Sequence, residues 1–309
     1  MNNILITGGA GNIGSALANA LAKRENNFVI IADNLSTGSF KKLVDIENLI
    51  FKEIDVNNYQ GIKNIFQEYN IDYVFHFAAV VGVQRTLNNP IDVLNDIKGI
   101  ENLLSLCHKH GIKRFYYSSS SEVYGEPVEI PMNELTTPLN SRLPYAIVKN
   151  LGEAYCRSYY QVYNLPYTIF RFFNTYGPQQ SEDFVIPLFI RKALINDDIT
   201  IYGDGSQTRT FCYIDDNIET CIKIYDNGLI KNDVINIGSD IEITILELAK
   251  IIIKTSESSS KIVFKEALKE GDMTRRNPDI TKMKEIILHK LIPIEEGIRN
   301  LIAYYQNDY

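Results

Sequence analysis

The chain contains no tryptophan and only four cysteines, four histidines and four methionines among its 309 residues. Cys107, Cys156, Cys212 and Cys221 show no paired spacing, which favours buried thiols in a reducing compartment over a disulfide framework. The histidines follow no metal-ligand spacing, so the sequence predicts no metal site. We therefore expect a cytoplasmic protein without a metal centre.

The sequence also lacks a basic run and a long apolar run. Its formal net charge of -7 argues against a surface that binds nucleic acid. No apolar segment is long enough to span a bilayer, and an apolar strand begins at once, which leaves no room for a signal peptide. We therefore expect neither nucleic acid nor a membrane as a partner.

Apolar, strand-like runs alternate with helix-period segments through the first half of the chain. Strands are expected at 3–7, 27–32, 49–54, 72–77, 113–118 and 166–173. Helices are expected between them at 13–24, 58–69, 90–109 and 144–163. This alternation predicts parallel strands joined by right-handed crossovers, so the fold class is α/β with a Rossmann-like doubly wound parallel sheet.

A glycine-rich turn, TGGAGNIG, follows the first strand at residues 7–14. Its first glycine permits a sharp turn, the middle one lets the backbone approach a phosphate, and the last allows close packing of helix on strand. The amides at the start of the next helix point their positive end at a pyrophosphate. The predicted phosphate-binding residues are Gly8, Gly11, Asn12, Ile13 and Gly14.

Asp33 ends the second strand about 20 residues further on, where a carboxylate accepts hydrogen bonds from the adenosine ribose. A carboxylate there repels a 2′-phosphate, so the sequence predicts NAD rather than NADP. We expect an NAD-binding domain over residues 1–175. Helices at 184–195, 215–227, 244–255 and 293–307, with short strands at 198–203 and 209–214, predict a smaller α/β substrate-binding region over 176–309, interdigitated with the first.

Tyr145 and Lys149 lie four residues apart on a predicted helix, so their side chains share a face. Lowering the pKa of a tyrosine from about 10 to about 7 requires roughly 4 kcal/mol. One ammonium at ~4 Å supplies a Coulomb energy of similar size. We therefore expect Tyr145 to act as a general base whose pKa Lys149 lowers. The serines at 118–121 follow a strand end and offer a hydroxyl for the same proton transfer.

Taken together, these motifs make the chain resemble the extended short-chain dehydrogenase/reductases that act on nucleotide sugars, which include 4-epimerases, 4,6-dehydratases and UDP-glucuronate decarboxylases. The motifs that carry the resemblance are TGGAGNIG at 7–14, DNL at 33–35, DV at 55–56, HFAA at 76–79, SSSSEVYG at 118–125, YxxxK at 145–149, RFFNTYGP at 171–178, IYGDGSQTRTF at 201–211 and RRNPDI at 275–280.

The resemblance implies that Tyr145 removes a proton from the C4 hydroxyl of the sugar while hydride passes to NAD, and that Ser120 assists. Further cofactor contacts are implied at Asn34, Asp55, Val56, Ala78, Ala79, Asn95 and Ser118. Contacts with the nucleoside-diphosphate sugar are implied at Asn174, Arg209, and Arg275 or Arg276. A homodimer formed through the helices at 90–109 and 144–163 is also implied.

The residues after Ser120 bear on the fate of the 4-keto sugar. The dehydratases place an Asp-Glu pair where this chain has Ser121 and Glu122, which disfavours 4,6-dehydration. The decarboxylases carry Ser-Glu there and an arginine that matches Arg276, but segment 78–84 lacks the proline-containing loop expected of them. We expect C4 epimerisation of a nucleoside-diphosphate hexose, with Glu122 in the site, and keep decarboxylation of a UDP-hexuronic acid as the alternative.

Two other classes fit the sequence less well. A simple NAD-dependent carbonyl reductase would not need Arg209 or Arg275. A dinucleotide sensor without catalysis would not need Ser120, Tyr145 and Lys149 together.

Overall fold

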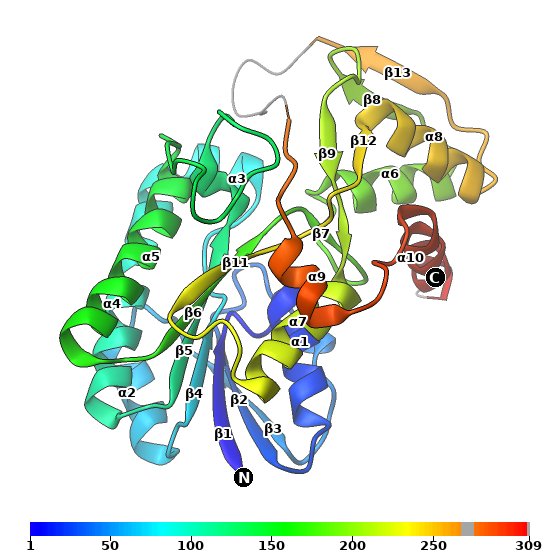
Figure 1. The fold of residues 1–309 in the computed structure, drawn as a ribbon. Coiled ribbons are helices and arrows are strands. Elements are labelled where there is room, and N and C mark those ends of the chain that lie inside the picture. The colour runs from blue at the N-terminus through cyan, green and yellow to red at the C-terminus, as the bar shows by residue number, and fades with distance from the viewer. Residues whose placement is uncertain (267–274, 308–309) are drawn as a thin grey trace.

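The computed structural model describes residues 1–266 and 275–307, and a seven-stranded sheet runs through its centre (Figure 1). The strand order is β11-β6-β5-β4-β1-β2-β3, and every neighbouring pair is parallel. The strands are β1 (Asn2–Thr7), β2 (Asn27–Asp33), β3 (Leu49–Glu53), β4 (Tyr73–His76), β5 (Arg114–Ser120), β6 (Tyr167–Phe172) and β11 (Asp233–Ile237). The predicted doubly wound α/β fold is confirmed.

Helices cover both faces of this sheet. On one face lie α2 (Tyr59–Glu68), α4 (Pro90–His110) and α5 (Pro144–Tyr163), and on the other α1 (Asn12–Ala22) and α7 (Ile214–Asn227) (Figure 1). In β1, Ile4 and Ile6 join the core on the α1 face, whereas Leu5 joins the core beneath α4. Because both faces are buried, the central strands are almost uniformly apolar.

The C-terminal part of the chain lies mainly beyond the carboxyl edge of the sheet (Figure 1). Three pairs of short strands form there: β7 with β10 and β8 with β13 in parallel, and β9 with β12 antiparallel. The elements are β7 (Thr175–Tyr176), α6 (Val185–Leu194), β8 (Ile199–Tyr202), β9 (Thr208–Thr210), β10 (Cys212–Tyr213), β12 (Glu242–Thr244), α8 (Ile245–Thr255), β13 (Ile262–Lys265), α9 (Thr281–Ile287) and α10 (Ile294–Asn307).

The chain crosses the boundary predicted near residue 175. Helix α7 returns to pack on α1, and β11 adds a seventh strand to the sheet beside β6. The sequence patterns predicted the helix but not the strand. Short elements also missed are α3 (Val83–Asn88), the 3-10 turns η1 (Phe40–Lys42) and η2 (Ser121–Tyr124), β12, β13 and α9.

Helix α5 lies close against β5 because of a glycine on its inner face. A Cβ atom on Gly152 would lie 2.1 Å from the Tyr117 hydroxyl, so only glycine permits this approach. The helix begins with Pro144 in its first turn and ends at Asn164, whose φ is 56°. This packing fixes the height of Tyr145 and Lys149 above the strand end. No helix within 1–266 or 275–307 is long and apolar enough to cross a bilayer.

Candidate active site

A cavity of about 620 Å³ opens at the carboxyl edge of the central sheet. The residues predicted for cofactor binding and catalysis line it together. They are Gly8, Gly11, Asn12, Ile13, Gly14, Asp33, Asn34, Asp55, Val56, Ala78, Ala79, Asn95, Ser118, Ser120, Glu122, Tyr145 and Lys149. Among the predicted substrate-binding residues, Asn174 and Arg276 line the same cavity, whereas Arg209 and Arg275 do not.

The glycine-rich turn follows β1 beside the end of β4, and Gly8 and Gly14 have no room for a side chain. Gly8 has a φ of 69°, and a Cβ atom there would lie 2.4 Å from the Ala78 amide nitrogen. A Cβ atom on Gly14 would lie 2.2 Å from the Gly8 carbonyl oxygen. The N-cap of α1, Gly11, provides no side-chain cap, so the first amides of the helix are available to a ligand. This cradle fits a pyrophosphate.

Asp33 stands at the end of β2 with its carboxylate held by backbone amides. Its Oδ2 accepts from the Ala10 amide at 3.0 Å, and its Oδ1 accepts from the Leu35 amide at 2.8 Å. Beside it, the Asn34 side chain donates to Asp55 Oδ2 at 3.0 Å. The carboxylate is therefore oriented toward the cavity at the point where sequence reasoning placed the adenosine ribose.

Three side chains at the far end of the cavity form the predicted proton-transfer group. Lys149 Nζ donates to the Ser118 carbonyl at 2.7 Å and lies 5.7 Å from the centre of the Tyr145 ring. Ser120 lies beside Tyr145 and lowers the pKa of its phenol, and Ser120 Oγ accepts from the Glu122 amide at 3.2 Å. The end of β5 and the first two turns of α5 thus bring Ser120, Tyr145 and Lys149 together.

The electrostatics of this group differ from the expectation for Tyr145. Burial raises the pKa of the Tyr145 phenol, with Glu122 adding to the rise and the Ser120 hydrogen bond opposing it. Burial also lowers the pKa of Lys149 to about 8. Lys149 is not among the groups that lower the pKa of the phenol in this structure, where burial is the largest influence and the ammonium donates to the Ser118 carbonyl.

Arg276 and Glu122 form an ion pair at the edge of the same cavity. Arg276 Nη2 lies 2.5 Å from Glu122 Oε1, and its Nη1 donates to Ser121 Oγ at 3.4 Å. The Arg276 side chain is buried, and among the residues that the structure describes its Nε has no hydrogen-bond partner. Arg275 points to the other side, where it pairs with Glu242 at 2.8 Å. The two adjacent arginines, which the sequence could not separate, therefore differ in access to the cavity.

The remaining predicted substrate residues lie near each other but not all in the cavity. Asn174 donates to the Thr210 carbonyl at 3.0 Å, next to Arg209 on β9. Arg209 is buried and donates from Nη1 to the Thr208 carbonyl at 2.7 Å. In the described parts of the chain no group of histidine, cysteine and acidic side chains is arranged to hold a metal ion.

Sequence reasoning missed several charged residues that line the cavity, among them Asp96 and Arg85. Asp96, on α4, accepts from the Val80 amide at 2.7 Å, and burial raises its pKa while the charge of Lys149 opposes the rise. Arg85, on α3, donates to the Ser36 carbonyl at 3.4 Å across the cofactor end. Asp96 follows Asn95 on α4, and both line the cavity. The predicted helix at 90–109 together with the expected contact at Asn95 could therefore have pointed to Asp96 as well.

Comparison with known proteins matches residues 4–238 to the family model described as the NAD dependent epimerase/dehydratase family. The chain belongs to this family. The resemblance stated from the motifs and its dependence on NAD are thereby confirmed. The protein is an enzyme of that family, whose members include both isomerases and lyases.

Curated relatives of this family member carry different activities in their names. It is 37% identical to a UDP-N-acetyl-alpha-D-glucosaminuronate decarboxylase from Bacillus cytotoxicus, over 98% of this chain and 97% of that one. It is 33% identical to a putative UDP-glucose 4-epimerase from Methanocaldococcus jannaschii, over 99% of both. Among solved structures, the UDP-glucose 4-epimerase of Thermotoga maritima with UDP-glucose superposes with a TM-score of 0.92 at 32% identity, covering 99% of both chains.

Proposed function

We propose that this family member is an NAD-dependent decarboxylase of a UDP-linked hexuronic acid, acting through a 4-keto sugar. The observation that carries the proposal is the Arg276–Glu122 pair at the edge of the cavity that Ser120 and Tyr145 also line. A guanidinium there provides a bidentate partner for the carboxylate of a hexuronate. The 37% identity to the Bacillus cytotoxicus decarboxylase supports the same reading.

The cofactor residues are those of the glycine cradle and the β2 end. Gly8, Gly11 and Gly14 leave space for the pyrophosphate, and Asp33 receives the adenosine ribose. When bound, NAD supplies the hydride acceptor for C4 of the sugar and a positive charge beside the phenol. That charge opposes the effect of burial on Tyr145.

Tyr145 and Ser120 take the proton from the C4 hydroxyl as the first step. Ser120 bridges the sugar oxygen and the phenolate, and Lys149 stabilises the phenolate before it accepts the proton. The product is a β-keto acid, with its carboxylate carbon attached to C5. Tyr145 then stands beside the C4 carbonyl oxygen, where charge develops in the second step.

Arg276 holds the carboxylate of the hexuronate so that the C5–C6 bond can break. The electron pair of the C5–C6 bond moves toward the C4 carbonyl, which gives an enolate with its charge on the C4 oxygen, and carbon dioxide leaves. A proton from solvent then adds to C5. Tyr145 returns its proton to the C4 oxygen, where the reduced cofactor would supply the hydride to C4. Glu122 orients Arg276 through the 2.5 Å ion pair before substrate enters. Ser121 stands where a dehydratase would need an acid, so dehydration has less support.

C4 epimerisation, which the sequence analysis favoured over decarboxylation, is the second candidate here. It needs only Ser120, Tyr145 and Lys149, and the Methanocaldococcus jannaschii relative and the Thermotoga maritima structure carry that activity in their names. In an epimerase, Arg276 would have no carboxylate to hold.

The deciding experiment incubates the holoenzyme with UDP-hexuronates and with UDP-, dTDP-, GDP- and CDP-hexoses, and records product mass. We expect loss of carbon dioxide from a UDP-hexuronate. Arg276→Gln is expected to slow that loss about 100-fold, since a buried charge-assisted contact is lost. The adjacent Arg275→Gln is the matched control and should stay within about threefold. A new stereoisomer of unchanged mass would make the protein an epimerase instead.

We also propose that the protein is a homodimer formed through α4 and α5. These two helices pack together and expose Ile91, Leu94, Ile147 and Leu151, which are 69%, 42%, 45% and 42% accessible. An apolar surface of this kind on adjacent helices is typical of a subunit interface. We expect sedimentation to give the dimer mass, and Leu151→Glu to give the monomer mass; a monomeric wild type would refute the dimer.

The proposed compartment is the cytoplasm. Its support is the four cysteines, all buried and without a disulfide. Fractionation of the producing cells tests it, since recovery outside the cytoplasm would overturn it.

A further inference from the structure

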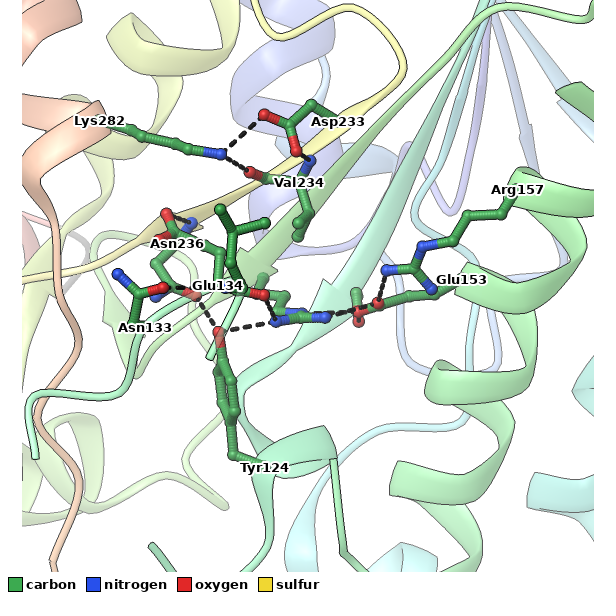
Figure 2. Close-up of polar contacts among 12 residues, drawn as sticks. Tyr124, Asn133, Glu134, Glu153, Arg157, Asp233, Val234, Asn236 and Lys282 are labelled. Carbon is green, nitrogen blue, oxygen red and sulfur yellow. Dashed lines mark hydrogen bonds and ion pairs between the residues drawn. The ribbon is translucent and has the colours of Figure 1, made fainter. Parts of the chain in front are cut away.

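Arg171, on β6, is the largest fully buried side chain in the described part of the protein. Its hydrogen-bond partners belong to two groups, and Figure 2 shows Glu153 beside Arg157 on one side and Tyr124 near Glu134 and Asn236 on the other. Nε and Nη2 each donate to an oxygen of Glu153 at 2.8 Å. Nη1 donates to the Tyr124 hydroxyl at 2.8 Å and to the Glu134 carbonyl at 3.2 Å. The planar fork therefore serves two separate sets of partners.

The first direction, which we call the helix arm, leads through Glu153 to α5. Glu153 lies four residues after Lys149 and eight after Tyr145, so all three occupy one face of the helix. Its Oε1 also accepts from Ser119 Oγ at 2.6 Å, between Ser118 and Ser120 of β5. Burial works against the Glu153 charge, but Arg171 and Ser119 hold the pKa of this carboxyl below its ordinary value. The helix arm thus ties the proton-transfer helix to its strand.

The second direction, which we call the segment arm, leads through Tyr124 to the residues that follow Arg276. The Tyr124 hydroxyl donates to Asn236 Oδ1 at 2.7 Å. The Asn236 amide group then donates to the Met132 carbonyl at 2.9 Å and to the Asp279 carbonyl at 3.1 Å. Asp279 lies three residues after Arg276, in an extended stretch that also pairs with Met132. The segment arm therefore fixes the backbone that presents Arg276 to Glu122.

We propose that Arg171 is a positioning residue that sets the distance between two parts of the active site, the Ser120–Tyr145–Lys149 group and the Glu122–Arg276 pair. The helix arm reaches the cavity wall at Ser119, between Ser118 and Ser120, and the segment arm ends at Asp279, three residues from Arg276. The guanidinium is planar and makes two hydrogen bonds to Glu153. A movement of Glu153 therefore tilts this plane and changes the geometry of the hydrogen bond from Nη1 to the Tyr124 hydroxyl. The proposal rests on the proposed function for the role of Arg276.

Two variants remove one oxygen each and leave the buried charge pair intact. Tyr124→Phe removes the first hydrogen bond of the segment arm, and Ser119→Ala removes the hydrogen bond that ties Glu153 of the helix arm to β5. Amide hydrogen exchange of the holoenzyme is expected to rise about tenfold over residues 277–281 in the first variant and over 145–153 in the second. Arg157→Gln is the matched control. It removes the exposed partner of Glu153, at 2.8 Å, and should change exchange in either region by less than about twofold.

Kinetics of the same variants test the catalytic consequence. Tyr124→Phe should slow carbon dioxide release about tenfold while the C4 oxidation, followed by absorbance of the reduced cofactor, stays within about twofold. Ser119→Ala should slow the oxidation first. Equal loss of both steps in both variants, or exchange that rises over the whole chain, would make Arg171 a purely structural residue and overturn the proposal. A wild type that releases no carbon dioxide refutes the proposed function, and the exchange pattern still decides this inference.

Discussion

Tyr145→Phe is expected to lower turnover about 1,000-fold while the protein still purifies with NAD bound. The phenol is the group placed to move the C4 hydroxyl proton, and general acid–base catalysis contributes factors of this size. The remainder of the cavity wall, including the glycine cradle, does not depend on the phenol oxygen. Turnover is measured on the nucleotide sugar that the wild type converts, and bound NAD by its absorbance after release from the protein.

The control for this variant is Tyr160→Phe. Tyr160 lies on the same helix but is 38% exposed and stands away from the cavity. It should keep activity within about twofold. A Tyr145→Phe enzyme that retains wild-type turnover would show that the proton leaves by another route.

Lys149→Met is expected to make the protein more stable and less active. Burial holds the pKa of Lys149 near 8 instead of 10.5, so at pH 7 the folded state carries a charge that it disfavours. That difference corresponds to about 3 kcal/mol. Loss of the hydrogen bond to the Ser118 carbonyl offsets about 1 kcal/mol. We expect the free energy of unfolding to rise by about 1–2 kcal/mol at pH 7, while turnover falls at least about 100-fold.

The stability difference between wild type and Lys149→Met should change with pH in a defined direction. Between about pH 8 and 10.5 the unfolded chain binds more protons at this lysine than the folded protein does. Wild-type stability therefore gains from rising pH in that window, and the methionine variant lacks the gain. Its advantage should be largest below pH 8 and vanish above pH 10.5. Melting temperatures across pH 7–11 measure this, with Lys23→Met, at an exposed site, as the control. A variant that melts lower than wild type at pH 7 would mean that burial does not strain Lys149.

Local patterns were sufficient for the first six strands of the sheet and for the cofactor end of the site. Each of those strands is a continuous apolar run followed by a turn, and the glycines of residues 7–14 have a steric reason that spacing alone reveals. Strand β11 has no such signal. It is five residues long, with Asn236 in its interior. Its partner β6 ends at Phe172, and 60 residues lie between that end and Asp233, where β11 begins. A pairing of that separation leaves no trace in local periodicity.

The sequence could not show which way the side chains of Arg275, Arg276 and Lys149 point, because that direction does not follow from the residue type. Arg275 and Arg276 are adjacent in an extended segment, so their side chains point to opposite sides, and only the backbone path decides which enters the cavity. The expectation for Tyr145 assumed an ammonium near the phenol and ignored burial. In the fold the ammonium is directed to Ser118, and burial is the largest influence on the phenol. Distances of this kind come from tertiary packing.

The position of β11 also matters while the chain is being synthesised. Until residues 233–237 leave the ribosome, β6 is an open strand edge whose backbone groups on one side have no partner. Sixty residues separate the two strands, which at 5–20 residues per second corresponds to roughly 3–12 s of translation. During that interval the nascent domain offers a template for strand pairing to other chains. A pause in translation after residue 172 would lengthen the exposure and favour aggregation, and faster synthesis of this stretch would shorten it.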